Sequence, residues 1–168
     1  RIESSSFLHG ITSAGAGIEN QQSTGLALVN NDFAMNQFGC TFASSPYCRF
    51  EGNRVNGRAT SVALGRGVRF GESSNFGVVS GNTISDTNLY GIYLQDSAFC
   101  DVSSNTVSFT GSGSNLAQHG IQSGGFEADF CHHNTFTGNM IRGCSGVGIA
   151  VAPTATTEQD LYNTISGN

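Results

Sequence analysis

The sequence contains no lysine and no tryptophan, and only 11% of its 168 residues are charged. Proteins that hold nucleic acid through its phosphates carry clustered basic residues, whereas this chain has seven arginines and a net charge of −5. We therefore predict no nucleic-acid partner. No apolar run approaches the roughly 20 residues that a membrane-spanning helix needs, so we predict no membrane segment.

Proline is also scarce, with two residues, and the five cysteines include no CxxC pair. The missing pairs exclude the common zinc-ribbon and dithiol motifs, and we predict neither a metal nor a cofactor. The cysteines suit a role as free, buried thiols. A Cys100–Cys131 disulfide remains an alternative that spacing alone cannot decide. Low charge leaves the surface to hydroxyl and amide groups, which hydrogen-bond neutral ligands such as sugars or serve only as a soluble coat.

A short phrase, Asn followed by any residue and then an apolar one, recurs along the chain at intervals of 22 to 29 residues. It begins at Asn31, Asn53, Asn82, Asn105, Asn134 and Asn163. A second phrase, Gly followed by an apolar residue, interleaves with it and begins at Gly17, Gly39, Gly67, Gly91, Gly120 and Gly148. Periods of this length indicate a stacked repeat architecture.

Apolar residues alternate with other residues inside each repeat, as in Val68-Arg69-Phe70. A period of two predicts short strands with one buried face. Each repeat holds three such strands and no helical stretch that could cover a flat parallel sheet. We therefore predict an all-β, right-handed parallel β-helix of about six coils, with three short strands per coil, as a single domain over residues 1–168. The missing caps and the mid-coil ends suggest a segment of a longer β-helix.

The two phrases resemble those of the pectate-lyase-like superfamily of right-handed parallel β-helices, for example in Gly91-Ile92-Tyr93-Leu94 and Gly81-Asn82-Thr83-Ile84. The resemblance implies that the repeat Asn residues form an inward ladder at a tight turn. Asn suits this role because it tolerates the left-handed backbone conformation and its amide satisfies buried polar groups. Within the superfamily the chain looks most like a bacteriophage tailspike, which implies a homotrimer, a polysaccharide ligand and a place on a virion surface or outside the cell.

Two carboxylates occupy equivalent places in neighbouring repeats: Glu72 follows Gly67 by five residues, and Asp96 follows Gly91 by five. Stacked strands lie about 4.8 Å apart, and two close carboxylates can divide acid and base work in glycoside hydrolysis. On the same coils we expect Arg69, Tyr93 and Gln122 to point outward as a sugar-binding row. The alternative is a pair of solvated turn carboxylates on a mixed surface.

A second candidate group contains Glu127, Asp129, His132 and His133, near Asp101 on the preceding coil and Glu158 and Asp160 on the following one. The spacing to the repeat Asn slips here, which predicts a bulge or a widened turn. Such residues can supply general acid–base groups or hold a hard cation. No known metal-ligand spacing is present, and a plain surface turn is the interpretation that the sequence favours.

Three functions follow from these patterns. The first is recognition and depolymerisation of a bacterial surface polysaccharide, by a lyase or a hydrolase, with Glu72, Asp96, Asp101, Glu127 and Asp129 as catalytic candidates. The second is a non-catalytic carbohydrate-binding or structural solenoid. The third is a periplasmic repeat protein similar to the family linked to copper-site maturation. The scarcity of clustered soft ligands counts against this third interpretation.

Overall fold

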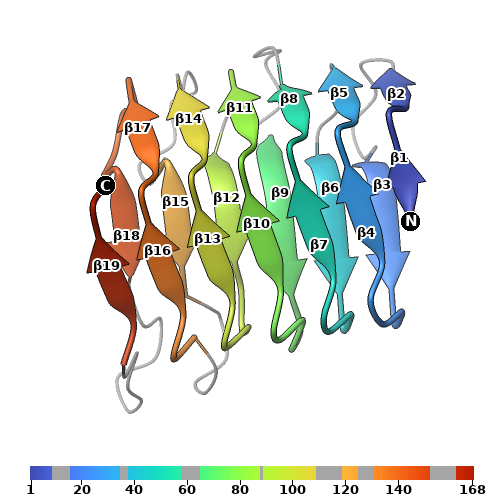
Figure 1. The fold of residues 1–168 in the computed structure, drawn as a ribbon. Helices are drawn as coiled ribbons and strands as arrows, with labels where there is room; N and C mark the ends of the chain where they lie inside the picture. The colour runs from blue at the N-terminus through green and yellow to red at the C-terminus, as the bar shows by residue number, and fades with distance from the viewer. Residues whose placement is uncertain are drawn as a thin grey trace.

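The computed structural model describes residues 1–8, 16–34, 38–57, 65–87, 89–108, 119–124, 131–151 and 162–168. Every regular element in these ranges is a β-strand, and the strands form three sheets in which all neighbours run parallel. The sheets wind into the predicted right-handed parallel β-helix, in which like positions of successive coils lie side by side along a rod (Figure 1).

The first sheet contains β1 (Ile2–Glu3), β4 (Ala27–Val29), β7 (Arg49–Glu51), β10 (Val78–Ser80), β13 (Asp101–Ser103), β16 (Thr135–Thr137) and β19 (Thr164–Ser166). The second contains β2 (Ser6–Leu8), β5 (Asp32–Ala34), β8 (Arg54–Asn56), β11 (Thr83–Ser85), β14 (Thr106–Ser108) and β17 (Met140–Arg142). The third contains β3 (Ala16–Gln21), β6 (Phe38–Ala43), β9 (Arg66–Gly71), β12 (Tyr90–Leu94), β15 (Ile121–Ser123) and β18 (Ile149–Val151).

The core is a set of apolar columns that run along the rod axis. In the first sheet Leu28, Phe50 and Val79 occupy paired positions of successive coils and are fully buried. The third sheet stacks Phe42 on Phe70 with ring centroids 4.5 Å apart. Each coil therefore buries its apolar face against the next one, which is how a repeat too small for its own core becomes stable.

The glycine of the Gly-apolar phrase marks a close approach between sheets. A Cβ on Gly67 would collide with the carbonyl oxygen of Gly91 and with the side chain of Ile84. Glycine is needed here because no larger residue fits between the start of a third-sheet strand and the second sheet.

The inward Asn ladder exists, but its last two members differ from the prediction. Asn53 Nδ2 donates to Asn82 Oδ1 (3.3 Å), and Asn82 Nδ2 donates to Asn105 Oδ1 (2.9 Å). The next bond then runs from Asn105 to Asn139 (2.9 Å), so the ladder skips Asn134. This step spans 34 residues, longer than the 22 to 29 expected for a coil.

Asn134 and Asn163 belong to a different turn. Asn134 Oδ1 accepts from the Cys100 N–H (2.8 Å), and Thr135 begins a strand of the first sheet rather than of the second. Asn168 is the ladder residue of the last coil. The apparent slip in spacing at Cys131 arises when Asn134 is counted as a ladder residue, whereas the ladder residue of that coil is Asn139. Asn134 instead accepts from the Cys100 N–H of the preceding coil, as aligned positions do in a regular stack.

The left-handed conformation also falls on another residue than expected. The residue before each ladder Asn carries it, as in Asn30 (φ 54°), Gly52 (φ 62°) and Ser104 (φ 56°). The ladder Asn therefore acts through its amide hydrogen bonds, and its neighbour makes the bend.

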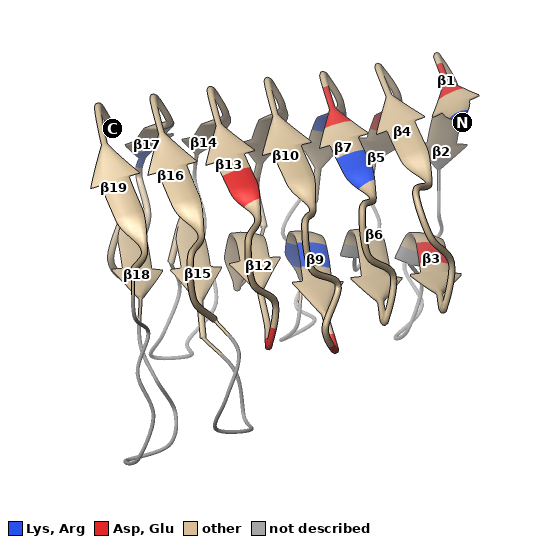
Figure 2. Cartoon of the chain, turned by 60° about the horizontal axis from the view of Figure 1, so that its bottom comes forward, with Lys and Arg blue, Asp and Glu red and all other residues tan. Residues whose placement is uncertain are grey.

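Charged residues are sparse in the described part of the rod (Figure 2). The four ion pairs among the described residues lie largely at the surface. Within the described ranges no helix is long and apolar enough to cross a membrane.

Candidate functional site

The predicted row on the third sheet is in register. Arg69 pairs with Tyr93, and Tyr93 pairs with Gln122. The row is not an open surface, however, because Tyr93 and Gln122 are only 5% and 9% exposed. A ligand at the surface can therefore reach Arg69, which is partly exposed, more readily than the other two.

Tyr93 lies beneath an arginine–tyrosine cluster. The Arg66 guanidinium carbon sits 5.2 Å from the centre of the Tyr93 ring and 5.8 Å from that of Tyr90. Burial raises the pKa of Tyr93 to about 12, so its hydroxyl stays protonated at physiological pH. These contacts are of the cation–π kind, which holds the arginine in place over the rings.

The two predicted carboxylates do lie on adjacent coils. Phe70 pairs with Leu94, and the Ser73 N–H just after Glu72 donates to the Asp96 carbonyl (2.9 Å). Both acidic residues take the left-handed conformation, with φ of 55° and 50°. The turn that follows the third sheet thus places the pair in neighbouring, equivalent positions. Their catalytic role remains a prediction.

Arg69 organises this place. Its Nη2 lies 3.2 Å from Glu72 Oε1, and its Nε donates to Gln95 Oε1 (2.9 Å). The Arg69 side chain is 15% exposed, whereas the Glu72 side chain is 58% exposed. The guanidinium therefore orients the carboxylate while leaving it open to a ligand.

The same edge of the rod carries a feature that the sequence analysis missed. This edge is formed by the segments that link each strand of the third sheet to the next strand of the first, and we call it the aromatic corner. The described parts of these segments include residues 22–26, 44–48, 72–77, 95–100, 131–134 and 162–163. Five consecutive coils each contribute one ring to a stack at this corner, and these rings form the aromatic ladder: Tyr47, Phe76, Phe99, His133 and Tyr162.

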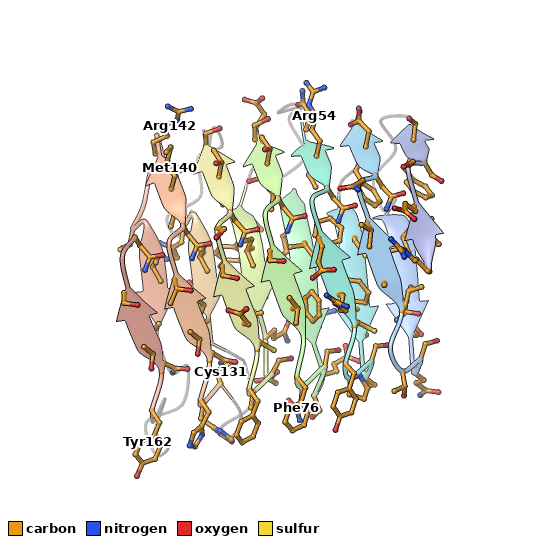
Figure 3. All side chains as sticks on the ribbon, in the orientation of Figure 1. Arg54, Phe76, Cys131, Met140, Arg142 and Tyr162 are labelled. Carbon is orange, nitrogen blue, oxygen red and sulfur yellow. The ribbon has the colours of Figure 1, made fainter. Side chains whose placement is uncertain are left out.

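The rings of the aromatic ladder stack face to face along the rod. Adjacent centroids lie 4.9 to 5.1 Å apart, with interplanar angles of 6° to 30°. The Tyr and Phe members are 43% to 71% exposed. Phe76 and Tyr162 mark the edge, which lies opposite the one that carries Arg54 and Arg142 (Figure 3).

Each ladder residue also has a left-handed backbone, with φ between 55° and 67°. Bulky residues rarely adopt this conformation, which favours glycine. Large ring side chains thus occupy five positions where they are both strained and exposed. Residues held in strained backbone conformations cluster at functional sites.

The second predicted group is only partly visible. Glu127, Asp129, Glu158 and Asp160 lie outside the described residues. Asp101 begins β13 on the outer face of the first sheet and accepts from Ser103 Oγ (3.1 Å). His132 lies on the aromatic corner, where its Nδ1 is 2.8 Å from His133 Nδ1.

The cysteines are free, as predicted, and four of the five are buried. Burial raises the pKa of the Cys100 thiol to about 12 and that of Cys40 well above its usual value. Cys131 is among the buried thiols, so the alternative of a Cys100–Cys131 disulfide is wrong. Buried neutral thiols are poor nucleophiles and poor metal ligands.

Comparison with known proteins adds the family. A family model described as "periplasmic copper-binding protein (NosD)" matches residues 9–168. The chain belongs to the NosD family. No curated protein and no solved structure matches it. The match supports a β-helical repeat protein of the periplasmic kind, and of the three interpretations only the third named such a family.

A copper-binding description raises the question of whether this NosD-family chain has the ligands. Among the described residues no group of three or more His, Cys, Asp or Glu side chains could hold a metal. The Cys131 thiol is buried and donates to the Leu94 carbonyl (3.5 Å), whereas His132 is partly exposed and His133 is exposed. At the aromatic corner the described residues therefore supply two adjacent imidazoles and do not form a complete copper centre.

One signal in the sequence would have revealed the aromatic ladder. Its five members each stand six residues before a residue of the true Asn ladder, for example Tyr47 before Asn53 and His133 before Asn139. Counting from Asn134 instead moves the phase by five residues and hides the last two rings.

Proposed function

We propose that this NosD-family β-helix acts outside the cytoplasm and recognises a carbohydrate chain at its aromatic corner. The observation that supports this best is the exposed aromatic ladder beside the Arg69–Glu72–Gln95 network. Sugars present apolar C–H surfaces and dense hydroxyl groups at once. The exposed ring edges along the stack, and any uncovered ring face, supply apolar surface for the first, and a planar guanidinium, amide and carboxylate match the second.

A more specific form of this proposal is that the protein also cleaves the bound carbohydrate chain. Glu72 and Asp96 occupy adjacent coils, and Arg69 orients one of them. One carboxyl group would donate a proton to the glycosidic oxygen while the other, as a carboxylate, would act as base or nucleophile. Asp101, Glu127 and Asp129 remain second candidates for these roles.

The most specific form of the proposal is the predicted homotrimer on a virion surface. The family description names the periplasm, which argues for a cell-envelope or extracellular glycan rather than for a tailspike. Light scattering on the purified protein distinguishes a monomer from a trimer. A trimer would favour the tailspike-like arrangement.

The test is incubation with a panel of bacterial envelope and surface polysaccharides, followed by binding measurement and mass spectrometry of products. Glu72→Gln and Asp96→Asn should abolish cleavage while binding persists. Asp32→Asn, on the second sheet away from the corner, is the matched control and should change nothing. Binding without products would support recognition alone, and a parent protein that neither binds nor cleaves any glycan would overturn the proposal.

Copper binding is the second candidate, and the observation that favours it is the short distance of 2.8 Å between the Nδ1 atoms of His132 and His133. Titration of the protein with Cu(I) and Cu(II) would test it. Stoichiometric uptake that is lost in His133→Ala but kept in His119→Ala would support a role for the pair. Uptake that ignores both substitutions would show that the pair is not the site.

A further inference from the structure

The aromatic ladder stops at Tyr47 although the rod continues. Phe76 is stacked between Tyr47 and Phe99, so both of its faces are covered. Tyr47 contacts Phe76 on one side only. On its other side lies the preceding coil, where the equivalent position is Gly25 and no ring is present.

The backbone of the Gly25 coil is built like that of the ring-bearing coils. The Gly25 N–H donates to the Pro46 carbonyl (3.0 Å), just as the Tyr47 N–H donates to the Asn75 carbonyl (2.9 Å). Gly25 has φ of 73°, close to the value of 61° at Tyr47. A Cβ at Gly25 would meet no heavy atom within 4 Å other than those of the two residues adjacent to it in the chain. The open place therefore results from the missing side chain alone.

This leaves one aromatic face open to ligands next to a ring-sized space. Gln22, Ser23 and Thr24 on the same turn are exposed and uncharged. Tyr47 itself is 56% exposed. Hydroxyl and amide groups around an aromatic face suit a neutral ring that carries hydroxyls, and the negative net charge disfavours an anionic one.

We propose that the face of Tyr47 above Gly25 is a stacking subsite for one neutral sugar ring of the bound glycan. The ring takes the sixth place of the aromatic ladder, in line with the five protein rings. Tyr47 is the only ladder residue with an uncovered ring face among those whose coil has a described coil on both sides. The subsite therefore fixes where the glycan begins to follow the aromatic corner. This inference rests on the proposed carbohydrate-binding function.

Two substitutions at one position isolate the subsite. Gly25→Tyr places a protein ring in the open space, whereas Gly25→Ala imposes the same left-handed strain without a ring. Saturation-transfer NMR and calorimetry with cellohexaose, maltohexaose and mannohexaose measure binding. We expect Gly25→Tyr to weaken binding by roughly fivefold or more, as the loss of one aromatic contact implies, and Gly25→Ala to match the parent protein.

The outcomes separate the two proposals. Binding by the parent protein that Gly25→Tyr leaves unchanged would overturn the subsite and leave the proposed function standing. A parent protein that binds none of the sugars in this set or in the polysaccharide panel would overturn both. Binding of indole at Tyr47 without any sugar would also overturn the subsite as a sugar site. Should Gly25→Tyr fail to fold, Tyr47→Leu removes the flat face and makes the same prediction.

Discussion

Asn82 offers the sharpest test of how the coil is held together. Its side chain is 1% exposed and makes bonds to both neighbouring coils. Asn82 Oδ1 accepts from the Asn53 N–H (2.8 Å), and Asn82 Nδ2 donates to the Phe50 carbonyl (2.8 Å) and to Asn105 Oδ1 (2.9 Å). Asn82→Ala removes these three bonds together with the bond that Asn82 Oδ1 accepts from Asn53 Nδ2 (3.3 Å), in a place that is closed to bulk solvent.

The magnitude follows from the groups that lose a partner. A buried donor or acceptor left unsatisfied costs about 1–3 kcal/mol. The Asn53 N–H and the Phe50 carbonyl both lose the amide, so the free energy of unfolding should fall by about 2–6 kcal/mol. Because whole domains are stable by only about 5–15 kcal/mol, this one change should remove a large share of the stability.

Urea denaturation followed by circular dichroism measures the change as a shift in midpoint. Thr83→Ala is the matched control, because Thr83 is the next residue, is exposed and points away from the ladder. Its effect should stay within about 0.5 kcal/mol. A loss below about 1 kcal/mol for Asn82→Ala would refute the view that the ladder amides satisfy buried backbone groups.

Three further predictions concern other parts of the rod. Cys144 is the one thiol that is not buried, so a maleimide should label it first in the native protein and label the other four only after denaturation; mass spectrometry showing early labelling elsewhere would contradict this. Phe76→Gly should be more stable than Phe76→Ala by about 1 kcal/mol in thermal unfolding, because both lose two ring contacts but glycine removes the left-handed strain; the usual order, with alanine better, would argue against that strain. Burial lowers the pKa of His119, so the unfolded chain binds the proton first and stability should fall as the pH drops below about 6.5; His119→Asn should flatten that pH profile, and an unchanged slope would exclude His119 as its source.

The architecture was predictable because its determinants are local and periodic. Alternation around Arg69 predicts a strand with Val68 and Phe70 inside, and both are fully buried. The Gly-apolar phrase recurs because the approach at Gly67 repeats at Gly39, Gly91 and Gly120. Signals of this kind depend only on spacing, and spacing survives when the three-dimensional context is unknown.

The phase of the last coils was not predictable from the phrase alone. Asn134-Thr135-Phe136 has the same form as Asn82-Thr83-Ile84, yet it begins a first-sheet strand. Both places need an inward amide at a bend followed by a strand with a buried centre, so the same residues satisfy both. Only the pairing of whole strands distinguishes them, and Met140 on β17 shows which Asn precedes the second sheet.

The candidate site depends on that phase more than on any single residue. Glu72 and Asp96 could be paired from the sequence because both follow a correctly placed Gly-apolar strand. The exposure of the site residues could not be predicted from the sequence. Tyr93 points away from the core and is nevertheless covered. The aromatic ladder can be recognised in the sequence once Asn139 and Asn168 replace Asn134 and Asn163 as ladder residues. Every ring residue then stands six positions before a buried Asn. In a solenoid, residues that are far apart in the sequence form one continuous surface when their coils are in register. A surface of this length can bind a long polymer such as a glycan.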